Sequence, residues 1–181
     1  MTPSSEDLDA WVPTPAVRTR RERSAAVGAD ELWRAAESVR LSEARTVGRL
    51  VRWRIPDTPA DLRFAELFDR YPFTPLESGP NHFLSGLCGR IWTFRGDYPR
   101  LRDASSFQSW DEPGTVRVLF AHWSEPNGTG GARIVSETRV EPVDRRAAVR
   151  LRALWTVVGR FEPLIGSEPL TLAARRAEQA R

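Results

Sequence analysis

The chain is poor in the residues that build covalent or metal-centred chemistry. It has one cysteine, Cys88, so it can form neither an intrachain disulfide nor a thiolate zinc cluster. All 27 basic residues are arginine, which excludes lysine Schiff-base catalysis and the lysine of a phosphate-binding loop. The two histidines, His82 and His122, lack a metal-ligand spacing such as HxxxH. We therefore expect neither a metal nor a cofactor.

Long apolar runs are also missing. No stretch approaches the roughly 20 apolar residues that a membrane-spanning helix needs. The N-terminal residues are polar and then basic, without the apolar segment of a secretory signal. We expect a cytoplasmic protein with no integral membrane segment, and nothing in the sequence indicates its oligomeric state.

Basic charge is concentrated near the N-terminus. The formal net charge is only +3, because 24 acids nearly balance the arginines. The dense basic cluster consists of Arg18, Arg20, Arg21 and Arg23. It has no interleaved aromatic side chains on which bases would stack. The sequence therefore favours a solvated edge strand over a nucleic-acid interface, and we expect no nucleic-acid partner.

The length of 181 residues is typical of one domain. Residues 1–16 are rich in proline, serine and acids, a composition that buries little surface and indicates a flexible leader. Trp11 is the exception, because a tryptophan in such a segment can dock on the domain. Residues 17–181 are expected to form the folded domain.

Short helices are predicted after a first strand at residues 17–27. Asp30 is a candidate cap for a helix whose apolar residues recur at helical spacing. A second short helix is expected to begin at Ser42. A third has Thr58 as its candidate cap and Pro59 at the first helical position.

Antiparallel strands and a C-terminal helix account for the rest of the chain. Strands are predicted at residues 82–94, 115–123 and 132–140, with the last two joined as a hairpin. Asp144 is the candidate cap of a long, apolar-striped helix, in which Ser167 can cap a second portion. Helices kept apart from an antiparallel sheet define an α+β fold.

The hairpin strands have two unequal faces, because side chains alternate along a strand. The more continuous apolar face, which we expect to point inward, consists of Val116, Val118, Phe120 and His122. In the following strand, one face carries Ile134, Ser136, Thr138 and Val140, and the other carries Val135, Glu137 and Arg139. The register that we expect places His122 nearer to Arg133 than to Glu137, and a shift of one residue would reverse the facing.

Two segments carry a resemblance to a known family. They are GADELWRAAESV near the start and IVSETRVEPVDRRAAVRLRALWTVVGRFEPLIG near the end. With the order of elements, they resemble the helix-grip superfamily, also called START-like or SRPBCC and including polyketide cyclase-like proteins, and in particular its bacterial members. The resemblance covers residues 17–180. The first strand departs from it, since RTRRER stands where the family alternates apolar residues.

The resemblance implies a bent antiparallel sheet of about seven strands wrapped around a long C-terminal helix. It also implies a cavity between the sheet and that helix for a lipid-like or polyketide-like molecule. The candidate ligand-binding residues are Trp92, Phe94, Phe120 and Trp155 as apolar lining, with His122 and Glu137 as polar groups that orient the ligand.

A structural role is the alternative for each candidate. The aromatic side chains can belong to the core, and His122 can be a hydrogen-bonded histidine at a strand end. Glu137 can pair with Arg139 in solvent, an interaction of little energetic weight. Inside a cavity, the same carboxylate would be a polar anchor.

Three functions therefore stay open. The first is binding of a small hydrophobic molecule. The second is an aromatase/cyclase-type enzyme in which His122 and Glu137 act as acid and base. The third is a protein-interaction module with a closed core. A serine hydrolase is disfavoured because Phe83 stands where the nucleophile elbow around Ser85 requires glycine.

Overall fold

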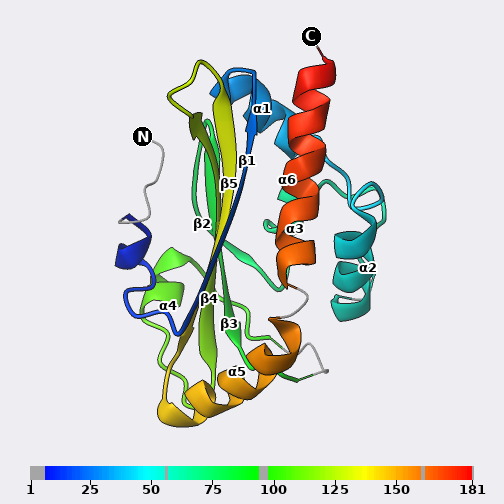
Figure 1. Ribbon diagram of the computed structural model, residues 1–181. Helices are drawn as coiled ribbons and strands as arrows, with labels where there is room; N and C mark the ends of the chain where they lie inside the picture. Colours follow the sequence, from blue (N-terminus) through cyan, green and yellow to red (C-terminus); the bar gives the residue numbers. More distant parts are fainter. Residues whose placement is uncertain (1–6, 56, 94–97, 160–161, 181) are drawn as a thin grey trace.

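One antiparallel sheet forms the centre of the protein. The computed structural model describes residues 7–55, 57–93, 98–159 and 162–180. The sheet has the order β1-β5-β4-β3-β2, so that the first strand of the chain lies beside the last (Figure 1). The strands are β1 (Val17–Ala25), β2 (Thr74–Gly79), β3 (His82–Gly89), β4 (Val116–Pro126) and β5 (Ala132–Pro142). Every neighbouring pair is antiparallel.

The sheet has five strands in the described part of the chain, so the expectation of about seven was wrong. Strand β3 ends at Gly89, whose φ of 136° leaves the extended region. Further along, Asp103 caps helix α4 (Ala104–Gln108) by accepting a hydrogen bond from the Ser106 backbone N–H at 2.8 Å. The described residues between β3 and β4 therefore form loop and helix.

Three short helices fall where they were expected but with different bounds: α1 (Ala29–Glu37), α2 (Arg45–Arg54) and α3 (Phe64–Leu67). A further short helix, η1 (Asp7–Ala10), lies in the leader, where no helix was expected. Gly28, rather than Asp30, occupies the N-cap position of α1. Helix α3 does not begin near Thr58, because the Thr58 hydroxyl donates a hydrogen bond to the Ile55 carbonyl at 2.7 Å and so closes a turn before it.

The C-terminal region forms two helices instead of one long helix. Asp144 caps α5 (Arg145–Val158) by accepting a hydrogen bond from the Ala147 backbone N–H at 2.7 Å, which confirms the predicted cap. The second helix, α6 (Glu162–Gln179), begins before Ser167. Figure 1 shows α5 crossing the lower end of the sheet, whereas α6 runs along one of its faces.

The two faces of the sheet are covered by different elements. We call the face toward α6 the inner face and the opposite one the outer face. Helices α6, α3 and α2 lie on the inner side, and η1 and α4 on the outer side (Figure 1). On the inner face, Ile134 packs against Trp33 of α1 and Leu170 of α6. The α+β class is thus confirmed, with the helices segregated from an antiparallel sheet.

The leader makes contact with the outer face. Residues 1–16 were expected to be flexible, but the structure places Leu8 and Val12 in a buried cluster with Phe107 of α4 and Trp123 of β4. The ring of Trp11 lies 6.4 Å from that of Phe107. From Asp7 onward, the leader therefore covers apolar surface that the sheet would otherwise expose.

Candidate functional site

A small cavity lies between the inner face of the sheet and helices α1, α3 and α6. Its volume is about 20 Å³, room for about one water molecule. The lining is mostly apolar and consists of Trp33, Ala36, Glu37, Phe64, Ala65, Phe83, His122, Ile134, Pro169 and Leu170. At this cavity the inner face of the sheet meets helix α6.

The histidine at the base of the cavity is surrounded by phenylalanine rings. The register of β3 against β4 places Phe83 opposite His122, and their rings are 4.7 Å apart. Phe68 lies 4.9 Å from the imidazole, and Phe64 meets it edge-on at 5.7 Å. These side chains exclude water from most of the imidazole.

Burial makes His122 a neutral group. Removal of water from around the imidazole lowers its pKa to about 3, because the charged form loses its solvation. Its Nε2 atom is buried and has no hydrogen-bond partner. A buried polar atom without a partner is costly, and a ligand hydroxyl or amide that reached it would remove that cost.

The predicted aromatic residues that the structure describes do not line the cavity. Phe120 is on the inner face beside His122, where it packs against Phe68 and Phe73 at ring distances of 5.4 Å. Trp92 lies near α5, with the guanidinium of Arg150 5.8 Å from its ring. Trp155 is a half-buried residue of α5, the helix that crosses the end of the sheet (Figure 1).

Phe94 lies outside the described residues. Of the predicted residues that are described, His122 is the one that lines the cavity. Ligand binding by these residues stays a prediction.

Glu137 and His122 are on opposite faces of the sheet. In the β4–β5 ladder His122 pairs with Ser136, whereas Glu137 pairs with Ala121. The expected register was wrong, since Arg133 lies opposite Glu125. Because neighbouring residues of a strand point to opposite faces, the carboxylate of Glu137 cannot form an acid–base pair with His122.

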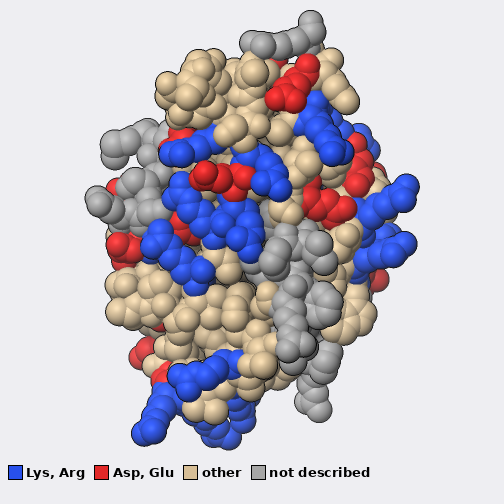
Figure 2. All heavy atoms as spheres, in the orientation of Figure 1, with Lys and Arg blue, Asp and Glu red and all other residues tan. Residues whose placement is uncertain are grey.

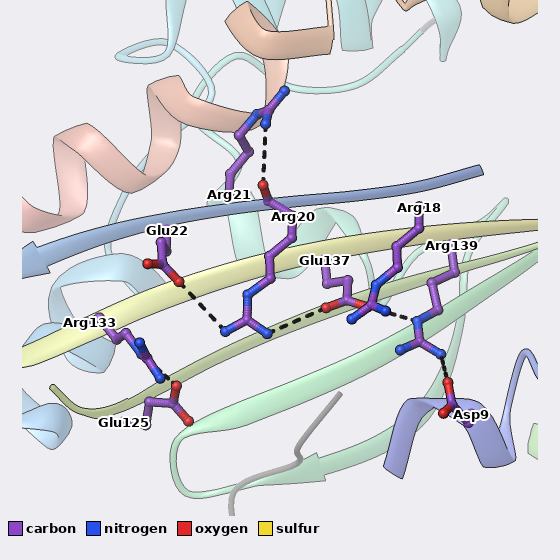
Figure 3. Close-up of polar contacts among 9 residues, drawn as sticks. All are labelled: Asp9, Arg18, Arg20, Arg21, Glu22, Glu125, Arg133, Glu137 and Arg139. Carbon is purple, nitrogen blue, oxygen red and sulfur yellow. Dashed lines mark hydrogen bonds and ion pairs between the residues drawn. The ribbon is translucent and has the colours of Figure 1, made fainter. Parts of the chain in front are cut away.

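Glu137 instead stands at the centre of an ion network on the outer face (Figure 3). Its side chain is 0% exposed, and its Oε1 atom lies 2.9 Å from Nε of Arg18 and 2.8 Å from Nε of Arg139. Arg20 approaches the other carboxylate oxygen at 3.7 Å. Several guanidinium groups thus compensate a fully desolvated carboxylate, which is the condition for tolerating such a charge.

The same network ties the leader to the sheet. Arg139, only 1% exposed, forms an ion pair with Asp9 of η1. Two residues further along β5, Glu141 makes a second contact with the leader, because its carboxylate accepts a hydrogen bond from the Thr14 backbone N–H at 3.2 Å. Glu141 also forms an ion pair with Arg117. The basic first strand is an edge strand, as predicted, and Arg18 and Arg20 pair with a buried acid.

Sequence patterns alone did not select the remaining lining residues. Trp33 lies in the segment GADELWRAAESV, which was predicted to be helical, and Phe83 was named as the residue that disfavours a serine elbow at Ser85. Phe64 and Leu170 became neighbours only through the packing of α3 and α6 over the sheet. A period identifies which side of a helix is apolar, but it does not identify the strand that this side covers.

The described residues contain no group of three or more His, Cys, Asp or Glu side chains that could hold a metal ion. Among them there is also no helix that is both long and apolar enough to cross a membrane.

Comparison with known proteins gives only distant likenesses. The chain matches no protein-family model and no curated protein. Among solved structures, it is similar to a protein from Thermus thermophilus, with 14% identity over 91% of this chain and 99% of the other and a TM-score of 0.37. It is also similar to the Zhui aromatase/cyclase from Streptomyces sp. R1128, with 16% identity over 91% and 97% of the two chains and a TM-score of 0.36.

A third similar structure is norcoclaurine synthase from Thalictrum flavum, with 14% identity over 91% and 85% of the two chains and a TM-score of 0.29. An aromatase/cyclase is thus among the similar structures. At these identities and scores, the likeness assigns no function, which has to come from the residues of the cavity.

Proposed function

We propose that the protein binds a small apolar molecule that carries one hydrogen-bonding group. The apolar part would lie among Trp33, Phe64 and Phe83, and the polar group would reach Nε2 of His122. The observation that carries this proposal is the unpartnered Nε2 atom in an otherwise almost wholly apolar cavity. Apolar lining with a few fixed polar groups is the usual composition of a small-molecule site.

Binding requires the cavity to widen, because a volume of about 20 Å³ holds no ring-sized molecule. Helix α3 is the wall that we expect to move. It is only four residues long, and its Phe64 and Ala65 are half-buried. Displacing Phe64 outward would join the cavity to the surface while the sheet and α6 keep their places.

A matched pair of probes tests this proposal. Equilibrium dialysis compares 2-naphthol, which has one hydroxyl, with naphthalene, which has none. We expect wild-type protein to prefer 2-naphthol about tenfold, the value of one hydrogen bond to a buried group. His122→Phe keeps an aromatic ring at the site but removes Nε2, so the preference should vanish. Failure of both probes to bind, or an unchanged preference in the variant, would contradict the proposal.

The small cavity volume favours a second candidate, an interaction module with a filled core. In that case neither naphthalene nor 2-naphthol binds, and the protein acts through its surface. The aromatase/cyclase alternative stays a prediction, but without its expected acid–base pair, since Glu137 lies on the outer face. Among the described lining residues, Glu37 is the only acid that accompanies His122.

A further inference from the structure

Helix α2 presents an unusual outer surface. Its sequence, RTVGRLVRWR, contains four arginines and no acid. Arg45, Arg49 and Arg52 recur at intervals of four and three residues, so they form one exposed basic ridge. Leu50 and Trp53 form a second, apolar ridge beside it, with 37% and 65% of their surfaces exposed. Figure 2 shows basic side chains standing out at the edge of the molecule where α2 lies.

The opposite side of α2 is fixed to the rest of the protein. Val47 and Gly48 are buried, and Gly48 lies so close to the Leu41 backbone that an added Cβ would collide with its carbonyl oxygen. The backbone N–H groups of Thr46 and Val47 each donate to the carboxylate of Glu168 in α6 at 3.0 Å. The two outer ridges are therefore held in a fixed orientation away from the core.

A basic ridge beside an apolar ridge matches the chemistry of an anionic membrane surface. Arginine binds lipid phosphates, and tryptophan and leucine enter the boundary between headgroups and acyl chains. A nucleic acid would engage the arginines but would leave Leu50 in water. We propose that α2 docks the protein on membranes that contain anionic lipids, lying parallel to the surface through Arg45, Arg49, Arg52, Leu50 and Trp53.

Docking through α2 would bring the cavity close to the membrane. Glu168, which caps α2, immediately precedes Pro169 and Leu170 in the cavity wall. The α6 wall of the cavity thus lies directly behind the docking helix. The inference does not depend on what the cavity binds, because the exposed ridges alone define the docking surface.

Sedimentation with vesicles tests the inference. The probes are vesicles of phosphatidylcholine alone and of phosphatidylcholine with an equal share of phosphatidylglycerol. We expect binding only to the second kind. Replacing Arg45, Arg49 and Arg52 together by Gln should weaken it about a hundredfold, since each surface arginine contributes roughly a factor of five. These positions are exposed, so circular dichroism should show an unchanged fold.

A second triple variant provides the matched control. Replacing Arg145, Arg146 and Arg152 by Gln on the exposed side of α5 removes the same charge from another basic helix. It should leave vesicle binding within about twofold of wild type. Trp53→Ala keeps every charge and should weaken binding about tenfold by removing apolar contact.

The inference is overturned if the anionic vesicles bind no protein, or if the α5 variant loses as much affinity as the α2 variant. It is also overturned if Trp53→Ala binds like wild type, because charge alone would then explain the association, as it would for a nucleic acid.

Discussion

His122 should make the folded state sensitive to mild acid. The pKa of a histidine in an unfolded chain is about 6.5, whereas burial lowers that of folded His122 to about 3. Between these two values the unfolded state binds more protons than the folded state does. The free energy of unfolding therefore falls as the pH falls through 6.5 toward 3.

The size of the effect follows from the two pKa values. At about pH 7.5 His122 is neutral in both states and contributes almost nothing. At about pH 5 the unfolded histidine is some 97% protonated while the folded one is not, which lowers the free energy of unfolding by about 2 kcal/mol. A folded-state pKa anywhere below about 4 gives nearly the same value, because the folded histidine then stays neutral at this pH.

Urea unfolding at both pH values measures this contribution, with His122→Phe as the matched variant. Phenylalanine fits among Phe64, Phe68 and Phe83 but does not titrate. All other titratable side chains are the same in the two proteins, so their contributions cancel in the comparison. The wild type should lose about 2 kcal/mol more than the variant on going from pH 7.5 to pH 5. Equal losses in the two proteins would refute the buried, neutral histidine.

Three further predictions concern the rest of the fold. Glu137→Gln should lower the free energy of unfolding by about 3 kcal/mol, because it removes the buried negative charge that faces the guanidinium groups of Arg18 and Arg139. Arg133→Gln, at a surface ion pair, should cost less than about 1 kcal/mol. Equal effects in urea unfolding would contradict the burial of Glu137. Gly48→Ala should destabilise the protein by about 2 kcal/mol through collision with backbone, and a rise in melting temperature would disprove that contact. Cys88, whose pKa burial raises to about 12, should resist a disulfide reagent at about pH 8 until urea unfolds the chain; rapid labelling of the native protein would show that it is accessible.

Local patterns predicted the hairpin and its neighbouring helix well. The inward face of β4 was read correctly, because Phe120 and His122 alternate with Leu119 and Ala121 along the strand. Asp144 was recognised as a cap because its side chain needs only the backbone three residues later. Such features depend on a few consecutive residues, all of which the sequence displays.

Features that depend on contacts between residues far apart in the chain could not be predicted from the sequence. Glu137 was expected beside His122, but the strand register that separates them is set by the whole ladder between β4 and β5. The leader was expected to bury little surface, yet Leu8 and Val12 pack in one cluster with side chains of the outer face and of α4. The expectation of about seven strands came from the family resemblance. The described part of the chain has five, because the end of β3 at Gly89 and the helix capped by Asp103 replace further strands.

The pairing of β1 with β5 joins two strands that are synthesised at different times. Val17 pairs with Val140, so β1 leaves the ribosome long before its partner exists. During that interval its backbone groups could join the strands of other nascent chains. The arginines of β1 oppose this pairing, because the same strand in another chain carries the same positive charge. Glu137, which is synthesised later, provides the carboxylate with which Arg18 and Arg20 pair when β1 joins β5.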